Sequence, residues 1–198
     1  MREEELLMWL LLATGFMGAM TLVFAVRWLA RKLGFVSVHA SHFSPKGGCQ
    51  DAVVREIQKA RREILVQAYS FTSEPICKAL IEAKKRGVQV EILLDHSNEK
   101  EQHTDLHLFV EKGLAPLVDA QHAIAHNKVM IIDRWTLLTG SFNFTNQAEH
   151  ENAENLLIIK GHGELVTLYR NNFFAHKGHC RAPQAKPVVA QQRGAKAA

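Results

Sequence analysis

Two stretches on either side of a short apolar run hold residues whose types and spacing could do chemistry. The first contains His126 and Lys128, and the second contains Ser141 and Asn143. Side chains two residues apart on a strand share a face, so each pair would project together. An imidazole can act as a nucleophile, while an ammonium, a hydroxyl and a carboxamide can donate hydrogen bonds to phosphate oxygens. The combination predicts attack on a phosphate ester, with the Glu154 carboxylate available to orient an imidazole.

The segment after Lys128 is the apolar run Val-Met-Ile-Ile. A strand this apolar does not normally carry a His and a Lys side by side, because buried charges are costly unless they are paired or used. Lys128 already supplies a positive charge, and no group of Asp, Glu and His at metal-ligand spacing surrounds His126. We therefore expect a site that uses no metal and no cofactor.

The elements that must position these residues are those of an α/β domain. As far as residue 113 the apolar strands alternate with helices, which is typical of a sandwich with parallel strands. Beyond residue 127 several apolar runs follow one another with short links and little helix. The fold class expected is a mixed, mostly parallel sheet sandwiched between helices. The expected strands are 35–38, 63–71, 88–94, 128–132, 135–139 and 155–159, and the expected helices are 50–62, 74–86, 106–113 and 164–174.

The spacing of the chemical residues, H-x-K-x4-D-x6-G-S-x-N, resembles the phospholipase D superfamily without a departure. The similarity extends over about residues 36–175 and includes Ala68-Tyr69-Ser70-Phe71-Thr72 and Asn152-Ala153-Glu154-Asn155. Within that family the chain looks like the small bacterial endonucleases that have one motif per chain and work as homodimers. The residues that carry the motif are His126, Lys128, Asp133, Gly140, Ser141 and Asn143.

This resemblance implies a two-step phosphodiester transfer without a metal. His126 would attack phosphorus to give a phosphohistidine, and a second histidine would protonate the leaving oxygen. The non-bridging oxygens would be held by Lys128 and Asn143 with Ser141 in support, and Glu154 would orient a catalytic imidazole. Asp133 and Gly140 are expected to be structural parts of the motif.

Only one of the eleven histidines, His126, has a lysine two residues later. Because the implied mechanism needs two histidines, we expect a two-fold homodimer in which both motifs meet at the axis. An endonuclease acting on DNA or RNA is the favoured function. A lipid phosphodiesterase acting on phosphatidyl headgroups or cardiolipin is the alternative, and a non-catalytic membrane-tethered binding module is a further one.

Residues 6–26 form an uncharged apolar run of 21 residues. As a helix this run would span about 31 Å, the thickness of the hydrocarbon core of a bilayer. Arg27, Arg31 and Lys32 follow it, so the positive-inside rule places the following domain in the cytoplasm. A cleaved signal peptide that directs the domain out of the cytoplasm is the alternative, with Val38-His39-Ala40 as a poor cleavage site.

Three regions follow from these patterns: a membrane anchor over 1–32, a catalytic domain over 33–180 and a disordered basic tail over 181–198. Hydrophobic residues make up 47% and charged residues 22% of the chain, which excludes a wholly disordered protein. The formal charge of +4 comes from the two terminal regions, since 33–180 holds 16 basic and 17 acidic residues. Net charge therefore does not argue for nucleic-acid binding by the domain.

Smaller groups of residues keep two interpretations each. The basic runs at Lys59–Arg62 and Lys84–Arg86 could contact a nucleic-acid backbone, or could be helix ends favoured by the helix dipole. His122 could line the cleft of His126, although a solvated loop histidine is the simpler interpretation. His176, His179 and Cys180 form a short cluster that lacks the second half of a zinc site, so no metal ligand is predicted there.

Overall fold

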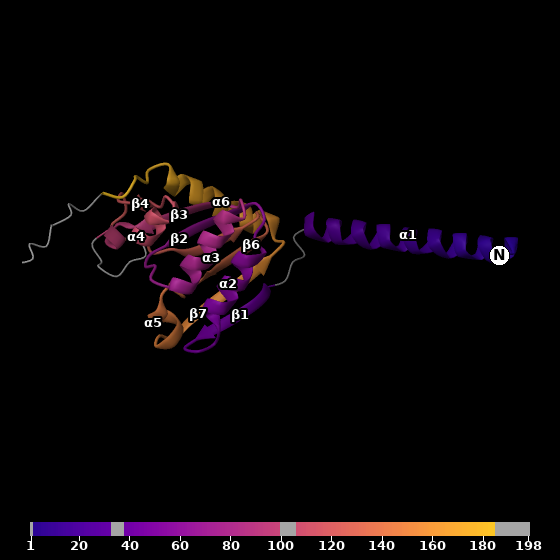
Figure 1. The fold of residues 1–198 in the computed structure, drawn as a ribbon, viewed down its shortest axis with the longest axis horizontal. Coiled ribbons are helices and arrows are strands. Elements are labelled where there is room, and N and C mark those ends of the chain that lie inside the picture. The colour runs from indigo at the N-terminus through magenta and orange to yellow at the C-terminus, as the bar shows by residue number, and fades with distance from the viewer. Residues whose placement is uncertain (1, 33–37, 100–105, 185–198) are drawn as a thin grey trace, which may run out of the picture.

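The computed structural model describes residues 2–32, 38–99 and 106–184 (Figure 1). A long N-terminal helix leads to a domain in which one sheet is covered by helices on both faces. The elements are α1 (Glu3–Lys32), β1 (Val38–Ser44), α2 (Cys49–Lys59), β2 (Glu63–Ala68), α3 (Glu74–Lys85), β3 (Gln89–Asp95), the 3-10 helix η1 (His96–Glu99), α4 (Leu106–Glu111), β4 (Leu117–Asp119), β5 (Lys128–Ile132), β6 (Thr136–Gly140), α5 (Asn146–His150), β7 (Glu154–Lys160) and α6 (Gly163–Lys177).

The seven strands form one sheet in the order β1-β7-β6-β5-β2-β3-β4. The predicted mixed sheet sandwiched between helices is confirmed, with one correction to the strand directions. Parallel pairing is confined to β2, β3 and β4, whereas the pairs β1–β7, β7–β6, β6–β5 and β5–β2 are antiparallel. For one of these pairs the reason is the length of the link, since β5 and β6 are joined by three residues, which allow a hairpin but no crossover helix.

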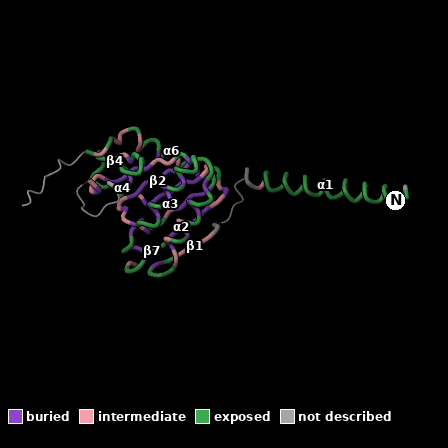
Figure 2. Tube along the Cα trace, viewed as in Figure 1, coloured by how far each residue is buried: buried purple, intermediate pink, exposed green. Residues whose placement is uncertain are grey.

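Alternation along the strands explains why both faces of the sheet are covered. Ile64 and Val66 of β2 pack into the larger core, which α2 and α3 cover, whereas Leu65 between them faces the smaller core under α6. Successive side chains of a strand point to opposite faces, so an unbroken apolar run is buried on both sides. The buried residues, shown in purple in Figure 2, run through the middle of the domain.

The two ends of the sheet differ in the chain segments they bring together. We call one of these ends the site end. There Lys128 pairs with Ala68, and Gly140 pairs with Leu156 near the start of β7. At the other, the linker end, Val38 pairs with Ile159, and Ile132 pairs with Ile64. The chain arrives from residues 33–37 at the linker end.

The remaining boundaries agree with the sequence pattern to within a few residues. The predicted strand 35–38 lies almost wholly outside the described residues, and β1 begins only at Val38. Within the predicted tail 181–198, Arg181 is part of the domain, since it forms a bridge with Val118 and its guanidinium hydrogen-bonds Glu99 at 2.8 Å. Residues 185–198 lie outside the described part of the chain.

The helix α1 is separate from both cores. Its segment Glu4–Ala30 is long and apolar enough to cross a membrane, and none of its most apolar window is buried inside the structure. A helix that is hydrophobic all round needs an apolar environment of some kind. This test by length and composition is also passed by signal sequences, so it gives no orientation.

Candidate active site

The motif residues gather at the site end of the sheet, with one exception. His126 lies in the loop before β5, and Lys128 is the first residue of that strand. Ser141 and Asn143 follow the last residue of β6, and Glu154 begins β7. Because β5, β6 and β7 are neighbouring strands, these strand ends lie side by side at the site end of the sheet. Asp133 is the exception and lies at the linker end.

Lys128 is a nearly buried cation, with 7% of its surface exposed. Its Nζ donates a hydrogen bond to the backbone carbonyl of His126 at 2.9 Å and lies 4.9 Å from the centre of the Tyr69 ring. Burial lowers the pKa of the Lys128 ammonium below its ordinary value, while the charge of Glu154 acts in the opposite direction. The site thus holds a desolvated positive charge near one carboxylate.

His126 is exposed, and its ring packs against Tyr69 with centroids 4.7 Å apart. The same tyrosine therefore contacts both the imidazole and the ammonium. Tyr69 was not among the predicted site residues. The segment Ala68–Thr72 that resembles the family contains Tyr69, but its contact with His126 depends on the pairing of β2 with β5, which the sequence does not show.

The close packing of the end of β6 against β7 explains why the motif has a glycine at position 140. Gly140 has a φ of 149°, and a Cβ there would lie 2.3 Å from the carbonyl oxygen of Asn155. That carbonyl accepts hydrogen bonds from the backbone N–H groups of Ser141 and Phe142, both at 3.1 Å. The side chain of Ser141 is held as well, because its Oγ accepts from the backbone N–H of Asn155 at 3.1 Å and from its Nδ2 at 3.2 Å.

Asn143 and Glu154 differ in how their polar atoms are used. The Oδ1 atom of Asn143 is buried and has no hydrogen-bond partner among the residues that the structure describes. One carboxylate oxygen of Glu154 accepts a hydrogen bond from Asn152 Nδ2 at 3.1 Å. A buried polar atom without a partner costs free energy and marks a place where a ligand or another chain can supply one.

Asp133 holds the backbone at the linker end. Its carboxylate accepts hydrogen bonds from the backbone N–H groups of Arg61, Arg62 and Glu63, at 2.9, 2.7 and 3.1 Å. These bonds join the turn before β2 to the end of β5. Asp133 follows the last residue of β5, whereas Lys128 is the first residue of that strand. Asp133 therefore lies at the opposite end of the sheet from the chemical residues.

The loop that carries His126 is fixed on both sides of that residue. The backbone N–H of Ala125 donates to Asp95 Oδ2 at 2.7 Å, and the carbonyl of Asn127 accepts from the backbone N–H of Tyr69 at 3.0 Å. Burial raises the pKa of Asp95, but hydrogen bonds from Ser97 and Ala125 outweigh it and keep the pKa below its ordinary value. The imidazole is therefore presented by a loop bound to the ends of β2 and β3.

One interpretation of the histidines needs correction. His122 does lie exposed in the loop after β4, with 44% of its side chain accessible, and its Nδ1 also lies 3.0 Å from Asp119 Oδ2. The cluster of His176 and His179 does have a second half, since both rings also contact Asp119, at 2.9 and 3.2 Å. The sequence could not show this, because Asp119 and His176 are 57 positions apart in the chain.

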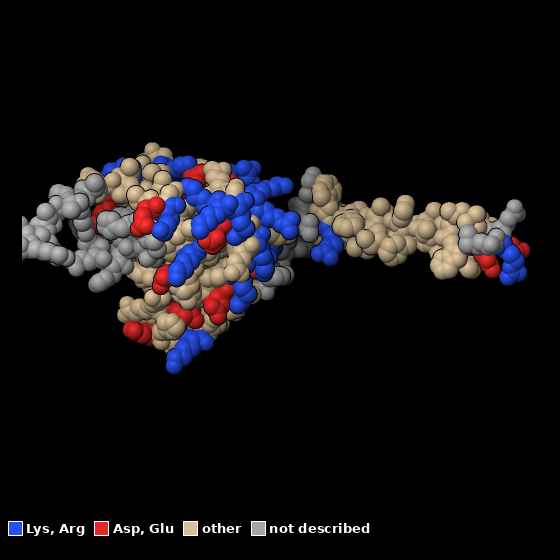
Figure 3. All heavy atoms as spheres, in the orientation of Figure 1, with Lys and Arg blue, Asp and Glu red and all other residues tan. Residues whose placement is uncertain are grey.

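The basic runs lie away from the motif. Arg61 and Arg62 precede β2, and Lys84–Arg86 precede β3, so both runs are at the linker end. Figure 3 shows Lys and Arg side chains gathered on the side of the domain where the chain arrives from the N-terminal segment. Lys85 pairs with Glu82 at 2.7 Å, and a guanidinium nitrogen of Arg86 donates to the carbonyl of Ile57 at 3.1 Å. These contacts agree with the helix-end interpretation.

Comparison with known proteins places this arrangement in a family. A family model described as the PLD-like domain of cardiolipin synthase matches residues 53–177. The phospholipase D of Rickettsia prowazekii is 42% identical over 135 residues, which cover 68% of this chain and 65% of that protein. The mitochondrial cardiolipin hydrolase of Chlamydomonas reinhardtii is 32% identical over 114 residues, covering 58% of this chain and 51% of that protein. The chain thus spans about half to two thirds of the length of these relatives.

Solved structures agree with the sequence comparison. Nuc from Salmonella typhimurium, described as a phospholipase D family member, superposes with a TM-score of 0.71 at 34% identity, covering 76% of this chain and 99% of Nuc. NucT from Helicobacter pylori has a TM-score of 0.64 at 20% identity, covering 72% of this chain and 98% of NucT, and shows the shared fold. With the family model matching more than half of its residues and the motif gathered at one end of the sheet, the chain belongs to the phospholipase D superfamily.

Proposed function

We propose that this chain is a phosphodiesterase that hydrolyses nucleic acid through a phosphohistidine at His126, with no metal ion in the chemical step. The observation that carries the proposal is the buried ammonium of Lys128, which hydrogen-bonds the backbone carbonyl of His126 and lies against the same Tyr69 ring as the exposed His126 imidazole. A desolvated cation favours an anion as its partner, and a phosphodiester would bring one to the nucleophile.

The chemical steps follow from the groups at the site end. The imidazole of His126 attacks phosphorus, so a P–N bond forms while the bond to the leaving oxygen breaks. A second imidazole donates a proton to that oxygen. The same imidazole then takes a proton from water, and the hydroxide displaces His126 from phosphorus. Lys128 and Asn143 hold the non-bridging oxygens, where negative charge accumulates in the transition state.

Ser141 and Glu154 have supporting parts in this mechanism. The hydroxyl of Ser141 accepts two hydrogen bonds from Asn155 and retains its own O–H to donate to a phosphate oxygen. Glu154 lies near enough to Lys128 to influence its pKa. We assign Glu154 the orientation of a catalytic imidazole, a part that fixes the tautomer and stabilises the charged ring.

The second imidazole comes from another copy of the chain, since one chain has a single histidine followed at two residues by lysine. We propose a two-fold homodimer in which His126 of the partner subunit completes the site. The exposure of His126 and the unpartnered, buried Oδ1 of Asn143 support an interface at the site end.

A mixing experiment tests the shared site. Copies with His126→Ala and wild-type copies, carrying different tags, are co-expressed in equal amounts and allowed to assemble. A site that needs both histidines leaves only wild-type pairs active, which is about one quarter of the assemblies under random pairing. Activity of about one half per total chain would show instead that each chain works alone.

The direction of the sheet supports nucleic acid as the substrate class. The N-terminal segment joins the domain at Val38, and β1 carries the chain from there to Ser44, which pairs with Glu154. Six residue steps along a strand separate these ends by about 20 Å. With α1 in a membrane and its basic flank Arg27 on the cytoplasmic side, the site is displaced from the membrane anchor along the sheet. This arrangement supports a substrate in the aqueous phase, such as DNA or RNA, over a lipid in the same bilayer.

A lipid phosphodiesterase is the second candidate, favoured by the names of the relatives. The Rickettsia protein is named phospholipase D, and the Chlamydomonas protein is named a mitochondrial cardiolipin hydrolase. Phosphatidyl headgroups present the same phosphodiester to the same imidazole, so the chemical residues do not separate the two candidates.

One assay separates these functions. The full-length chain in detergent micelles is offered single-stranded DNA, duplex DNA, RNA and cardiolipin-containing vesicles, with EDTA added together with the substrate. We expect cleavage of nucleic acid, no cleavage of lipid, and no activity for His126→Ala. The matched control, His150→Ala, changes an exposed histidine at the end of α5 and should retain wild-type activity.

Each other outcome replaces the proposal. Cleavage of cardiolipin alone would make the chain a lipid phosphodiesterase. Binding of nucleic acid without cleavage would leave a membrane-tethered binding module. Equal activity of His126→Ala and wild type would exclude His126 as the nucleophile.

A further inference from the structure

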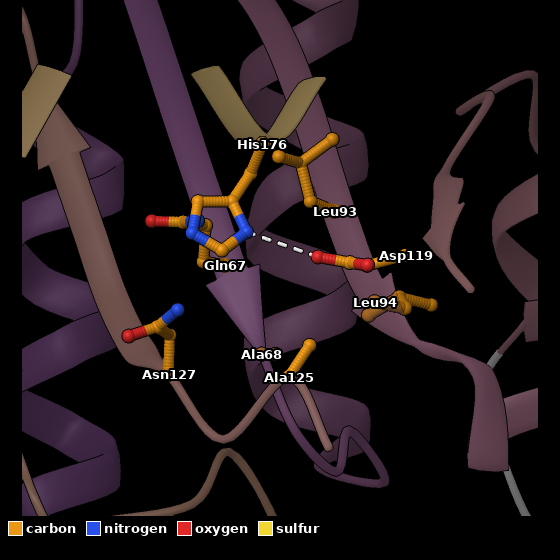
Figure 4. A pocket seen from close by; sticks show the side chains of 8 residues that line it. All are labelled: Gln67, Ala68, Leu93, Leu94, Asp119, Ala125, Asn127 and His176. Carbon is orange, nitrogen blue, oxygen red and sulfur yellow. Dashed lines mark hydrogen bonds and ion pairs between the residues drawn. The ribbon is translucent and has the colours of Figure 1, made fainter. Parts of the chain in front are cut away.

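We propose that Asp119, His122, His176 and His179 bind a zinc ion that fixes the loop leading to His126. The four residues come from two distant parts of the chain. Asp119 ends β4 and His122 lies in the loop after it, while His176 belongs to the last turn of α6 and His179 follows that helix. Figure 4 shows Asp119 and His176 pointing toward each other from β4 and from α6.

The distances match a four-coordinate ion. One potential ligand atom from each residue lies within 4.8 Å of the other three. The nitrogens of His122, His176 and His179 lie 3.0, 2.9 and 3.2 Å from the same oxygen, Asp119 Oδ2. A tetrahedral zinc ion with bonds of about 2.0 to 2.1 Å separates its ligand atoms by about 3.3 Å. The three nitrogen–oxygen distances are within about half an ångström of this separation, and the wider separations, up to 4.8 Å, would shorten when an ion binds between the four atoms.

Hydrogen bonding alone does not account for this arrangement. Oδ1 of Asp119 already accepts from the backbone N–H groups of Gln121 and His122, at 3.1 and 3.3 Å. Oδ2 faces three imidazole nitrogens, one of which, His122 Nδ1, also lies 3.1 Å from Oδ1, although a carboxylate oxygen has two lone pairs. The three rings also lie close together, with centroids 4.9, 5.1 and 5.3 Å apart. Nitrogen lone pairs directed at one cation remove this conflict.

The ligand set and its burial indicate zinc in a structural role. Three imidazole nitrogens and one carboxylate oxygen suit a tetrahedral zinc ion. The exposed fractions are 3% for the Asp119 side chain, 17% for His176, 25% for His179 and 44% for His122. With four protein ligands no coordination position remains for water, so the ion would stabilise the fold without activating a nucleophile. The spacing D-x2-H followed by H-x2-H also has the short paired form of zinc sites.

The position of the cluster explains what such an ion would do. It joins the end of β4 to the end of α6 at the site end of the sheet. It also fixes the start of the segment 119–128, whose other fixed points are Ala125 on Asp95 and Asn127 on Tyr69. His126 lies within this segment. Zinc binding thereby limits the positions open to the nucleophilic imidazole while staying outside the chemical step.

Metal content tests the proposal without any substrate, so its failure is distinguishable from failure of the proposed function. The full-length chain is produced with zinc in the medium, purified in detergent without a polyhistidine tag, dialysed, and analysed by plasma mass spectrometry. We expect about one zinc ion per wild-type chain. His179→Ala and Asp119→Ala should each retain about a tenth of that or less. His150→Ala is the matched control and should retain all of it.

A ligand exchange guards against variants that lose zinc only because they misfold. His179→Cys keeps a zinc ligand at that position, because a thiolate binds zinc as well as an imidazole does. We expect it to restore zinc content and to give the visible spectrum of a tetrahedral thiolate site when loaded with cobalt. A hydrogen-bonded cluster predicts no such spectrum. Wild-type protein without stoichiometric metal, or equal metal in wild type and His179→Ala, would overturn the proposal.

Discussion

The polar groups at the two ends of the sheet differ in whether they have partners within the described part of the chain. At the linker end the Asp133 carboxylate accepts three backbone N–H groups, and Glu63 pairs with Arg134 and Arg170 at 3.0 and 3.1 Å. At the site end Lys128 is buried without a salt bridge among the described residues, and Asn143 Oδ1 has no partner there. Groups satisfied within the chain stabilise it, whereas groups left available can bind a ligand. The contrast supports the proposed placement of the chemistry at the site end.

The largest expected effect comes from the nucleophile. His126→Asn should reduce kcat by about 10⁴-fold or more, because the covalent step is lost. The free energy of unfolding should change by less than about 0.5 kcal/mol, since the side chain is exposed. Initial rates and thermal unfolding measure the two quantities. Arg62→Ala, an exposed change at the linker end, is the control and should alter neither.

The next effect compares two glycines, one from each end. Gly140→Ala should destabilise the domain by about 3 kcal/mol or more, because the new Cβ would meet the Asn155 carbonyl at 2.3 Å in an unfavourable backbone conformation. Gly87→Ala at the linker end has a φ of 88° but open space around the Cβ, so about 1 kcal/mol is expected. Denaturant unfolding gives both values. Equal losses would show that the close approach to Asn155 is relieved at no cost.

Asp133→Ala separates stability from activity. Removing the acceptor of three backbone N–H groups should cost about 2 kcal/mol of unfolding free energy, because two of these groups can turn to water. Asp133→Asn keeps one oxygen acceptor and should lose less. At a temperature where all forms are folded, kcat should equal that of the wild type. A fall in kcat like that of a site variant would place Asp133 in the reaction.

The smallest effect concerns the pH dependence of Lys128. Burial holds the pKa of Lys128 below the ordinary lysine value and Glu154 raises it, so activity should fall on the alkaline side as the ammonium deprotonates. Glu154→Gln removes the raising charge, so the alkaline limb of kcat/KM should move to lower pH. Rates measured across that range report the shift. An unmoved limb would mean that another group sets it.

Much of this arrangement could be predicted from the sequence, for identifiable reasons. The helix α3 begins after Ser73, whose Oγ accepts a hydrogen bond from the backbone N–H of Ile76. Pro75 lies in the first turn of this helix. Both residue types are typical of helix starts, so the start of α3 could be predicted. The motif residues at the site end could also be predicted, because β5 and β6 follow each other along the chain and fix the spacing of these residues. Such features depend on residues that are close in sequence.

Other features depend on pairings that no local pattern contains. The directions of β5, β6 and β7 follow from which strands meet, so a prediction made from the alternation of the first half overstated parallel pairing. Tyr69 reaches His126 only because β2 pairs with β5. The group of Asp119 with the three histidines forms where β4 meets α6, which brings residues 57 positions apart into hydrogen-bond contact.

The attachment of the chain at Val38 sets a limit on reach. Residues 33–37 can extend at most about 18 Å, and β1 adds about 20 Å to the site end. If α1 lies in a bilayer, the site end of β1 can therefore lie at most about 40 Å from the end of α1. Under the proposed function, a long polymer could pass a new segment through that region after each cut, whereas a compact soluble molecule would have to arrive there by its own diffusion. Such a tether would favour repeated cutting of extended molecules near a membrane surface.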